Sequence, residues 1–310
     1  MRRSVQLGLS LVAVAVQVVA LGPAISAQDE GTTYLKVRDA HSRPHGGASN
    51  LIYHGGPVEL AAQVYVVYWG SEWNTGFTGG GVFSGDAQAY VNNFFGNVGG
   101  SSWAASTTQY CQGAAMGATQ CAAGASGPTN PANELVATWT DPSAVPLHPT
   151  GAQIAAEALN LANHFNAAQS GAQFFVLTPS GHSQKGFGTV WCAYHSSSGN
   201  LSFAYMPYQP DAGANCGANF VNSGAGGLLD GFSIVGGHEY AETITDPQPN
   251  SGWLDSSGAE NGDKCAWISS GQGAATDISL GNGPNNQFAV QSLWSNAFNG
   301  GAGGCVVSFP

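Results

Sequence analysis

The chain has 310 residues, only 8% of them charged, and a formal net charge of −11. Beyond Ser49 the only basic side chains are Lys185 and Lys264. Such a surface lacks the cations that displace counterions from a phosphate backbone, which excludes nucleic acid as a partner.

The first 50 residues differ in composition from the rest. Residues 1–27 combine a basic start, an uncharged apolar run and small residues ending at Ala27, which predicts a secretory signal peptide cleaved after that residue. The mature protein is then expected to be secreted, without a membrane span. Residues 28–50 carry charges and few apolar side chains, so we expect a disordered arm or a short propeptide. Residues 51–310 contain no linker and predict one globular domain, which we expect to be a monomer.

Helices and strands intermix along this domain. Runs of β-branched and aromatic residues predict strands, and apolar residues at helical spacing predict helices. In chain order these are a strand at 62–70, a helix at 86–95, a small-residue loop at 99–127, a helix at 150–168, a strand at 173–178, a hairpin at 189–195 and 201–205, and closing strands at 288–293 and 305–309. The mixture predicts an α/β or α+β fold with a mixed central sheet and Gly-rich loops.

Six cysteines lie beyond the predicted signal peptide. An even number of cysteines in an exported chain indicates disulfides, although the spacing alone allows many pairings. The simplest is sequential pairing: Cys111 with Cys121, Cys192 with Cys216, and Cys265 with Cys305.

One further predicted helix carries the residues with the clearest chemistry. Ser233 is a suitable N-cap, and Pro247 blocks continuation of the helix. Between them His238 and Glu242 are four positions apart, so both project from one face and can ligate one divalent metal. Glu239 occupies the position of the general base in His-Glu-x-x-His zinc hydrolases. This zincin-like motif differs from theirs by a glutamate in place of the second histidine.

A downstream acidic segment offers the third ligand. Glu260 follows Glu242 by eighteen positions, as in zincins whose third ligand comes from a separate segment. Asp263 is expected to orient His238 or Glu260 from outside the ligand set, and the sequence leaves open which of Glu260 and Asp263 lies nearer the metal. One histidine with two carboxylates makes a harder, more anionic site than two histidines with one glutamate, so we expect zinc, with calcium or manganese as alternatives.

Three more side chains are candidates for functional sites. His195 follows a cysteine that we expect in a disulfide, and it is a candidate for a further ligand or for a donor to an oxyanion. A structural histidine at the end of a strand is an equal alternative. Asp246 and Asp255 are candidates for a separate calcium site.

Several short segments form a combined pattern along the chain: 53–57 (YHGGP), 64–70 (VYVVYWG), 192–195 (CAYH), 237–242 (GHEYAE), 245–247 (TDP), 252–253 (GW), 260–265 (ENGDKC) and Cys305. Together they resemble the phosphate-induced, or exordium-like, family of secreted proteins. The likeness runs in the same order along the chain, although the chain lacks the first cysteine of the family's paired-cysteine segment before His195. The resemblance implies an extracellular protein with its site on the helix that contains 237–242.

These residues lead to three functional hypotheses. The first is a secreted metal-dependent hydrolase of extracellular peptides or a cell-wall substrate, with the metal on His238, Glu242 and Glu260. In it Glu239 takes a proton from the attacking water and His195 stabilises the oxyanion. The second is a non-catalytic cell-wall or glycan-associated protein with a structural metal and with aromatic stacking surfaces at Trp69, Trp73, Trp103 and Tyr205. The third is an acid hydrolase that uses two carboxylates without metal.

Overall fold

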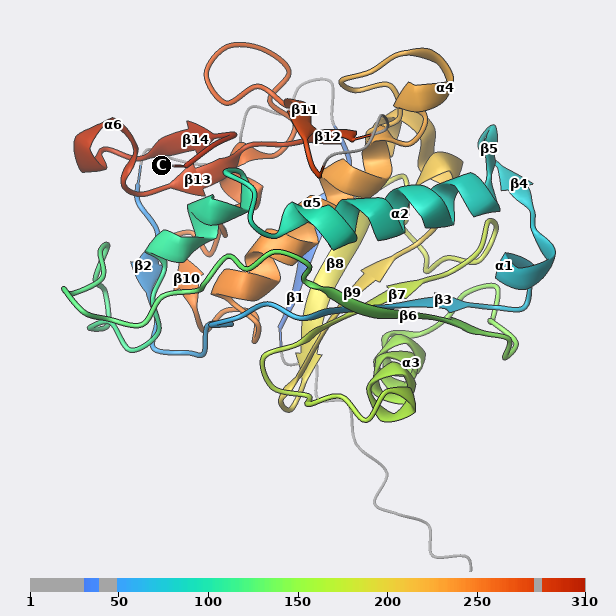
Figure 1. The fold of residues 1–310 in the computed structure, drawn as a ribbon, viewed down its shortest axis with the longest axis horizontal. Coiled ribbons are helices and arrows are strands. Elements are labelled where there is room, and N and C mark those ends of the chain that lie inside the picture. Colours follow the sequence, from blue (N-terminus) through green and yellow to red (C-terminus); the bar gives the residue numbers. More distant parts are fainter. Residues whose placement is uncertain (1–30, 39–48, 282–285, 310) are drawn as a thin grey trace, which may run out of the picture.

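The structure is a computed structural model that describes residues 31–38, 49–281 and 286–309 (Figure 1). The predicted signal peptide at 1–27 lies outside these ranges, as does most of the predicted arm. The described chain has a mixed α/β fold with a mixed central sheet, as the intermixed helix and strand patterns predict.

The central sheet is built from strands far apart in the sequence. Their bounds are β1 Thr32–Lys36, β3 Val64–Trp69, β6 Leu135–Asp141, β7 Gln173–Leu177, β8 Trp191–Ser198 and β9 Leu201–Met206. Within the described ranges the order is β1-β8-β9-β7-β3-β6. β9, β7, β3 and β6 are parallel, whereas β8 is antiparallel to β9 and β1 is antiparallel to β8. The strands predicted at 62–70 and 173–178 and the predicted hairpin are confirmed.

Helices cover both faces of this sheet (Figure 1). α2 (Ser84–Val98) and α5 (Asp230–Thr245) lie on one face, and α3 (Gly151–His164) lies on the other. Residues of β3 alternate between the two apolar cores: Val64, Val66 and Tyr68 face α2 and α5, and Tyr65, Val67 and Trp69 face α3. A strand covered on both faces needs apolar side chains at every position, which explains its continuous apolar sequence.

The predicted helices are confirmed with changed ends. α3 begins after Thr150, whose hydroxyl oxygen accepts from the backbone N–H of Gln153 (3.3 Å) while its own N–H donates to Gln153 Oε1 (2.8 Å). α5 begins at Asp230, so the prediction that Ser233 is its N-cap is wrong. Ser233 lies inside the helix, where its hydroxyl donates to the backbone carbonyl of Ala289 (2.6 Å).

Short elements form the rest of the described chain. The strand pairs are β2 (Ile52–Tyr53) with β10 (Trp253–Leu254), β4 (Thr78–Gly79) with β5 (Val82–Phe83), β11 (Thr276–Ser279) with β12 (Gln287–Val290), and β13 (Leu293–Ser295) with β14 (Gly304–Val306). The helical turns are α1 (Glu72–Thr75), η1 (Ala104–Gln109), η2 (Gln209–Cys216), α4 (Gly224–Gly227), η3 (Asp263–Cys265) and α6 (Phe298–Gly301). Closing strands are therefore present near both predicted positions, 288–293 and 305–309.

Part of the predicted N-terminal arm is an ordered strand. β1 pairs along β8 with Thr33 opposite His195. The ring of Tyr34 lies 5.0 Å from the ring of Tyr194, and the indole N–H of Trp267 donates to the carbonyl of Lys36 (2.8 Å). The disordered-arm prediction is wrong for residues 32–36, because strand pairing and aromatic packing compensate for the scarcity of apolar side chains there.

The predicted sequential disulfides are confirmed in the described chain. Cys111 is bonded to Cys121, Cys192 to Cys216, and Cys265 to Cys305. The second disulfide joins β8 to η2, and the third joins η3 to β14. Among the described residues, no helix combines the length and the apolar character that crossing a bilayer requires.

Candidate metal centre

Helix α5 runs through the interior, and each of its residues is buried. Two glycines allow neighbouring side chains to approach its backbone. A Cβ on Gly236 would lie 3.3 Å from Phe95 Cζ, and a Cβ on Gly237 would lie 3.1 Å from Trp103 Cη2. This close packing holds the helix in one orientation and so determines where His238 and the carboxylates after it point.

A first group of possible ligands forms around His238. Its Nε2 lies 3.0 Å from Glu242 Oε1 and 3.9 Å from Asp263 Oδ1. One ligand atom from each of the three residues lies within 4.8 Å of the other two. His238 and Glu242 meet because they are one helical turn apart. Asp263 comes from η3, and its backbone N–H donates to Glu242 Oε1 (2.9 Å).

A second group forms around His195, on the other side of Glu242. His195 Nδ1 lies 3.3 Å from Glu239 Oε2 and 3.5 Å from Glu242 Oε2. These three residues also place one ligand atom each within 4.8 Å of the others. His195 stands inside β8, not at a strand end, and its pairing across the sheet brings it to α5. The prediction that His195 belongs to the site therefore agrees with its position.

Glu260 takes a different position from the one predicted. It belongs to neither group of described residues, and its Oε1 lies 3.4 Å from His195 Nε2. The ligand set of His238, Glu242 and Glu260 is therefore not brought together. The 3₁₀ turn at η3 places Asp263 beside Glu242 instead, while the backbone N–H of Glu260 donates to Asp263 Oδ2 (3.3 Å). Of the two carboxylates between which the sequence left the third ligand open, Asp263 is the one that lies with His238 and Glu242.

Gln291 is part of the centre, although the sequence contains no signal that singles it out. Its Nε2 donates to the carbonyl oxygens of Gly262 (2.8 Å) and Ser292 (3.2 Å). These two acceptors orient the amide so that Gln291 Oε1 faces His238 Nδ1 at 3.2 Å. In a neutral imidazole Nδ1 then carries the proton, and the lone pair of Nε2 points at Glu242 and Asp263.

We expect Gln291→Leu to weaken metal binding at His238 by about 10–100-fold, because the imidazole loses the acceptor that orients it. The measurement is competition for zinc with a fluorescent chelator. Gln272→Leu is the matched control, since the Gln272 side chain donates to the carbonyl of Cys305 outside the centre. Equal zinc affinity of Gln291→Leu and the control would contradict this role of Gln291.

Burial and close contacts shift the pKa values of the centre in different directions. Burial lowers the pKa of His238, but the surrounding carboxylates, Glu242 first, raise it to about 10. Burial likewise lowers the pKa of His195, and the carboxylates around it, Glu260 first, raise it well above 6.5. Burial raises the pKa of Glu242, yet the two imidazoles lower it to about 2. Burial also raises the pKa of Glu260 well above 4.5 and that of Asp263 to about 7, so these carboxyls hold a proton more readily than Glu242 does.

Several atoms of the centre are also left without hydrogen bonds. His195, His238, Glu239, Glu242 and Glu260 are fully buried, whereas the Asp263 side chain is 23% exposed. Of the buried atoms without a hydrogen-bond partner in the described chain, six belong to the centre: His195 Nε2, His238 Nε2, Glu239 Oε1, Glu242 Oε2 and both carboxylate oxygens of Glu260. Buried polar atoms normally have a partner, so converging nitrogen and oxygen donors without one fit a divalent cation.

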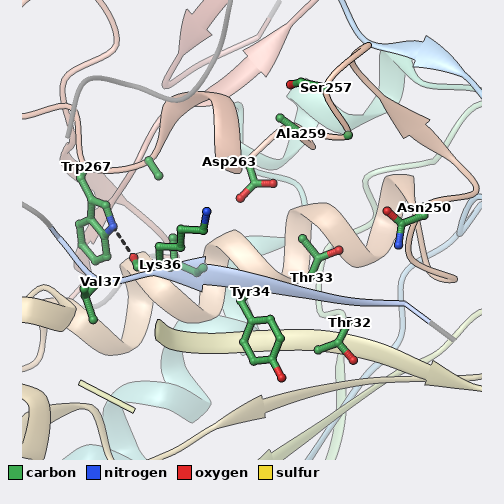
Figure 2. Close-up of a pocket in the computed structure, with 13 residues that line it drawn as sticks. Thr32, Thr33, Tyr34, Lys36, Val37, Asn250, Ser257, Ala259, Asp263 and Trp267 are labelled. Carbon is green, nitrogen blue, oxygen red and sulfur yellow. Dashed lines mark hydrogen bonds between the residues drawn. The ribbon is translucent and has the colours of Figure 1, made fainter. Parts of the chain in front are cut away.

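A cavity of about 430 Å³ lies beside the centre (Figure 2). Its lining includes residues 32–37 of the β1 segment and residues 257–259. The two groups and Glu260 together comprise six residues, and among these six only Asp263 lines the cavity. Asp263 is therefore the side chain through which the buried centre meets this space.

Two other expectations are corrected. Asp246 and Asp255 do not offer a calcium site, because their carboxylates already have partners. Asp246 accepts from the backbone N–H groups of Asn250 and Gly252 (both 2.7 Å), and Asp255 accepts from Lys264 Nζ (2.7 Å). The aromatic residues expected to form stacking surfaces are buried, none more than 7% exposed: Trp69, Trp73, Trp103 and Tyr205.

Comparison of the chain with protein-family models, curated proteins and solved structures finds no match. The resemblance of its motifs to the exordium-like family therefore stays a prediction. What can be concluded about function rests on the geometry and charge of the centre.

Proposed function

We propose that the protein is a secreted, zincin-like, divalent-metal-dependent hydrolase that acts on peptide bonds. The observation that carries the proposal is the buried convergence of two histidines and four carboxylates, with ligand atoms left unpartnered in the described chain. Clusters of buried groups whose pKa values are shifted from their ordinary values are common at functional sites. The three disulfides accord with the secreted setting that the N-terminal sequence predicts.

His238, Glu242 and Asp263 are the residues that would hold the metal. Their donor set of one imidazole nitrogen and two carboxylates favours zinc or manganese, since calcium prefers oxygen ligands alone. When bound, the cation supplies Lewis-acid activation of water and of a substrate carbonyl.

Glu239 is the proposed general base. It follows His238 on α5, and its Oε1 is buried without a hydrogen-bond partner in the described chain. Burial raises the pKa of Glu239, which brings the carboxylate closer to the basicity that a general base needs near neutral pH. Glu239 would take the proton of the attacking water and pass it to the leaving amine nitrogen, while His195 beside it stabilises the oxyanion.

The substrate class follows from the cavity beside Asp263. β1 ends the order of strands in the described sheet, so its outer edge is not paired with another strand there. That strand lines the cavity (Figure 2). A strand edge binds an extended peptide through main-chain hydrogen bonds, which supports a peptide as substrate in preference to a glycan.

The test is hydrolysis of a peptide library by the zinc-loaded protein. We expect Glu239→Gln to lower kcat by about 10²–10⁴-fold, because the amide cannot accept the proton, while the zinc stays bound. Glu157→Gln is the matched control, since Glu157 is a buried carboxyl of α3 outside the centre. Full activity of Glu239→Gln with zinc bound would remove Glu239 as the base, and a wild-type protein that cleaves no peptide would overturn the proposal.

One observation favours a second function, that of a non-catalytic extracellular protein with a structural metal. Five residues of the centre are fully buried, which suits a cation that only stabilises the fold. The buried aromatic residues do not support the stacking surface expected for glycan binding. Zinc that is present in the protein, together with no hydrolysis of peptides, would favour this second function.

A further inference from the structure

The two oxygens of Glu242 face different histidines. Oε1 lies 3.0 Å from His238 Nε2, and Oε2 lies 3.5 Å from His195 Nδ1. Glu242 is the one residue common to the two groups of potential ligands in the described chain. A carboxylate that presents each oxygen to a separate donor set has the arrangement of a bridging ligand between two metal ions.

The two groups have the same composition. Around one oxygen of Glu242 stand His238 and Asp263, and around the other stand His195 and Glu239. Each group thus holds one imidazole nitrogen, one carboxylate of its own and one oxygen of Glu242. Glu239 Oε1 and Glu242 Oε2 are buried without hydrogen-bond partners in the described residues, so unused ligand atoms are present in the second group.

His238 is also oriented from behind by an acceptor. Gln291 Oε1 lies 3.2 Å from His238 Nδ1. An acceptor behind the imidazole holds the proton on the outer nitrogen and leaves the inner lone pair free for a metal. At the second histidine, Nδ1 faces Glu239 Oε2 at 3.3 Å, and Nε2 lies 3.4 Å from Glu260 Oε1 without a hydrogen bond between them.

We propose that the centre binds two divalent cations, bridged by Glu242. The second cation is held by His195 and Glu239, and the donor set favours zinc or manganese at both positions. This inference rests on the proposed function only in taking the centre to be a metal site. It changes the role of His195 from oxyanion donor to ligand, and Glu239 ligates through Oε2 while Oε1 stays available to accept a proton.

The experiment is metal analysis of the full secreted protein, with EPR spectra after loading with Mn²⁺. We expect two Mn²⁺ per chain and the exchange-coupled spectrum of a bridged pair in the wild type. His195→Ala and Asp263→Ala should each retain one ion with an uncoupled spectrum. His164→Ala is the control and should keep two, because His164 stacks on Trp139 outside the centre.

The outcomes separate the two proposals. One ion per wild-type chain, with an uncoupled spectrum, would overturn the second cation and leave the single-metal hydrolase standing. No bound ion in the wild type would overturn both. Two ions retained in a folded His195→Ala variant would overturn the assignment of the second position to this histidine.

Discussion

If the centre holds the proposed metal, excess EDTA is expected to lower the melting temperature of the protein by roughly 10 °C. Without the cation, the fully buried ligands Glu239 and Glu242 lose their ionic interaction with it. Breaking a buried ionic interaction typically costs about 3–5 kcal/mol, and in a chain of this size each kcal/mol shifts the melting temperature by roughly 2–4 °C. Differential scanning calorimetry before and after EDTA measures the effect, and adding ZnCl₂ or MnCl₂ should reverse it.

Glu242→Gln distinguishes loss of metal from a general effect of the chelator. This variant keeps the shape of the side chain but removes one negative charge and the ligand common to both groups. Its melting temperature should therefore change little when EDTA is added. An equal melting temperature of the wild type with and without EDTA would contradict a metal centre and favour the metal-free acid hydrolase.

Lys264→Met is expected to lower the free energy of unfolding by about 3–5 kcal/mol, because it leaves the Asp255 carboxylate buried without its cation. Lys264 Nζ lies 2.7 Å from Asp255 Oδ2, and both side chains are at most 1% exposed. The ammonium also lies 4.3 Å from the centroid of the Trp294 ring. Urea unfolding at pH 7 measures the change in free energy.

Two controls and a pH series test the origin of this effect. Lys185→Met removes an exposed lysine and should leave stability unchanged. Lys264→Met combined with Asp255→Asn should recover part of the loss, because no uncompensated charge remains. A loss below about 1 kcal/mol in Lys264→Met would show that the pair does not stabilise the fold.

The sign of the pH dependence follows from Asp255. Burial raises the pKa of its carboxyl, but Lys264 and Ser257 lower it from 3.8 to about 2. Because the pKa of Asp255 is lower in the folded than in the unfolded protein, the ionised carboxylate stabilises the folded state above pH 3.8. This contribution is lost as the pH falls toward 2. The difference in stability between wild type and Lys264→Met should accordingly be largest near neutral pH and shrink on acidification.

Much of the fold follows from local patterns in the sequence. β3 and β7 are continuous apolar runs because both faces of the sheet are covered. α3 has a capping box at Thr150 and an apolar stripe, both readable from its own residues. β6 was not predicted, because it is an edge strand whose residues are mostly half-exposed, so it lacks the apolar run that marks the interior strands.

One half of the candidate centre could be predicted from local sequence. His238 and Glu242 meet because helical geometry sets the distance between residues four apart, whatever the rest of the chain does. The disulfides follow the simplest, sequential pairing, although the cysteine spacing alone allowed many others.

The other half depends on long-range packing. His195 reaches Glu239 because β8 packs against α5, and Gln291 reaches His238 from the end of β12; no local period encodes these contacts. The choice between Glu260 and Asp263 has the same origin, because a single 3₁₀ turn at η3 sets which carboxylate faces Glu242. Residues three positions apart in an irregular segment have no fixed relative direction, so their roles depend on long-range packing that sequence spacing does not contain.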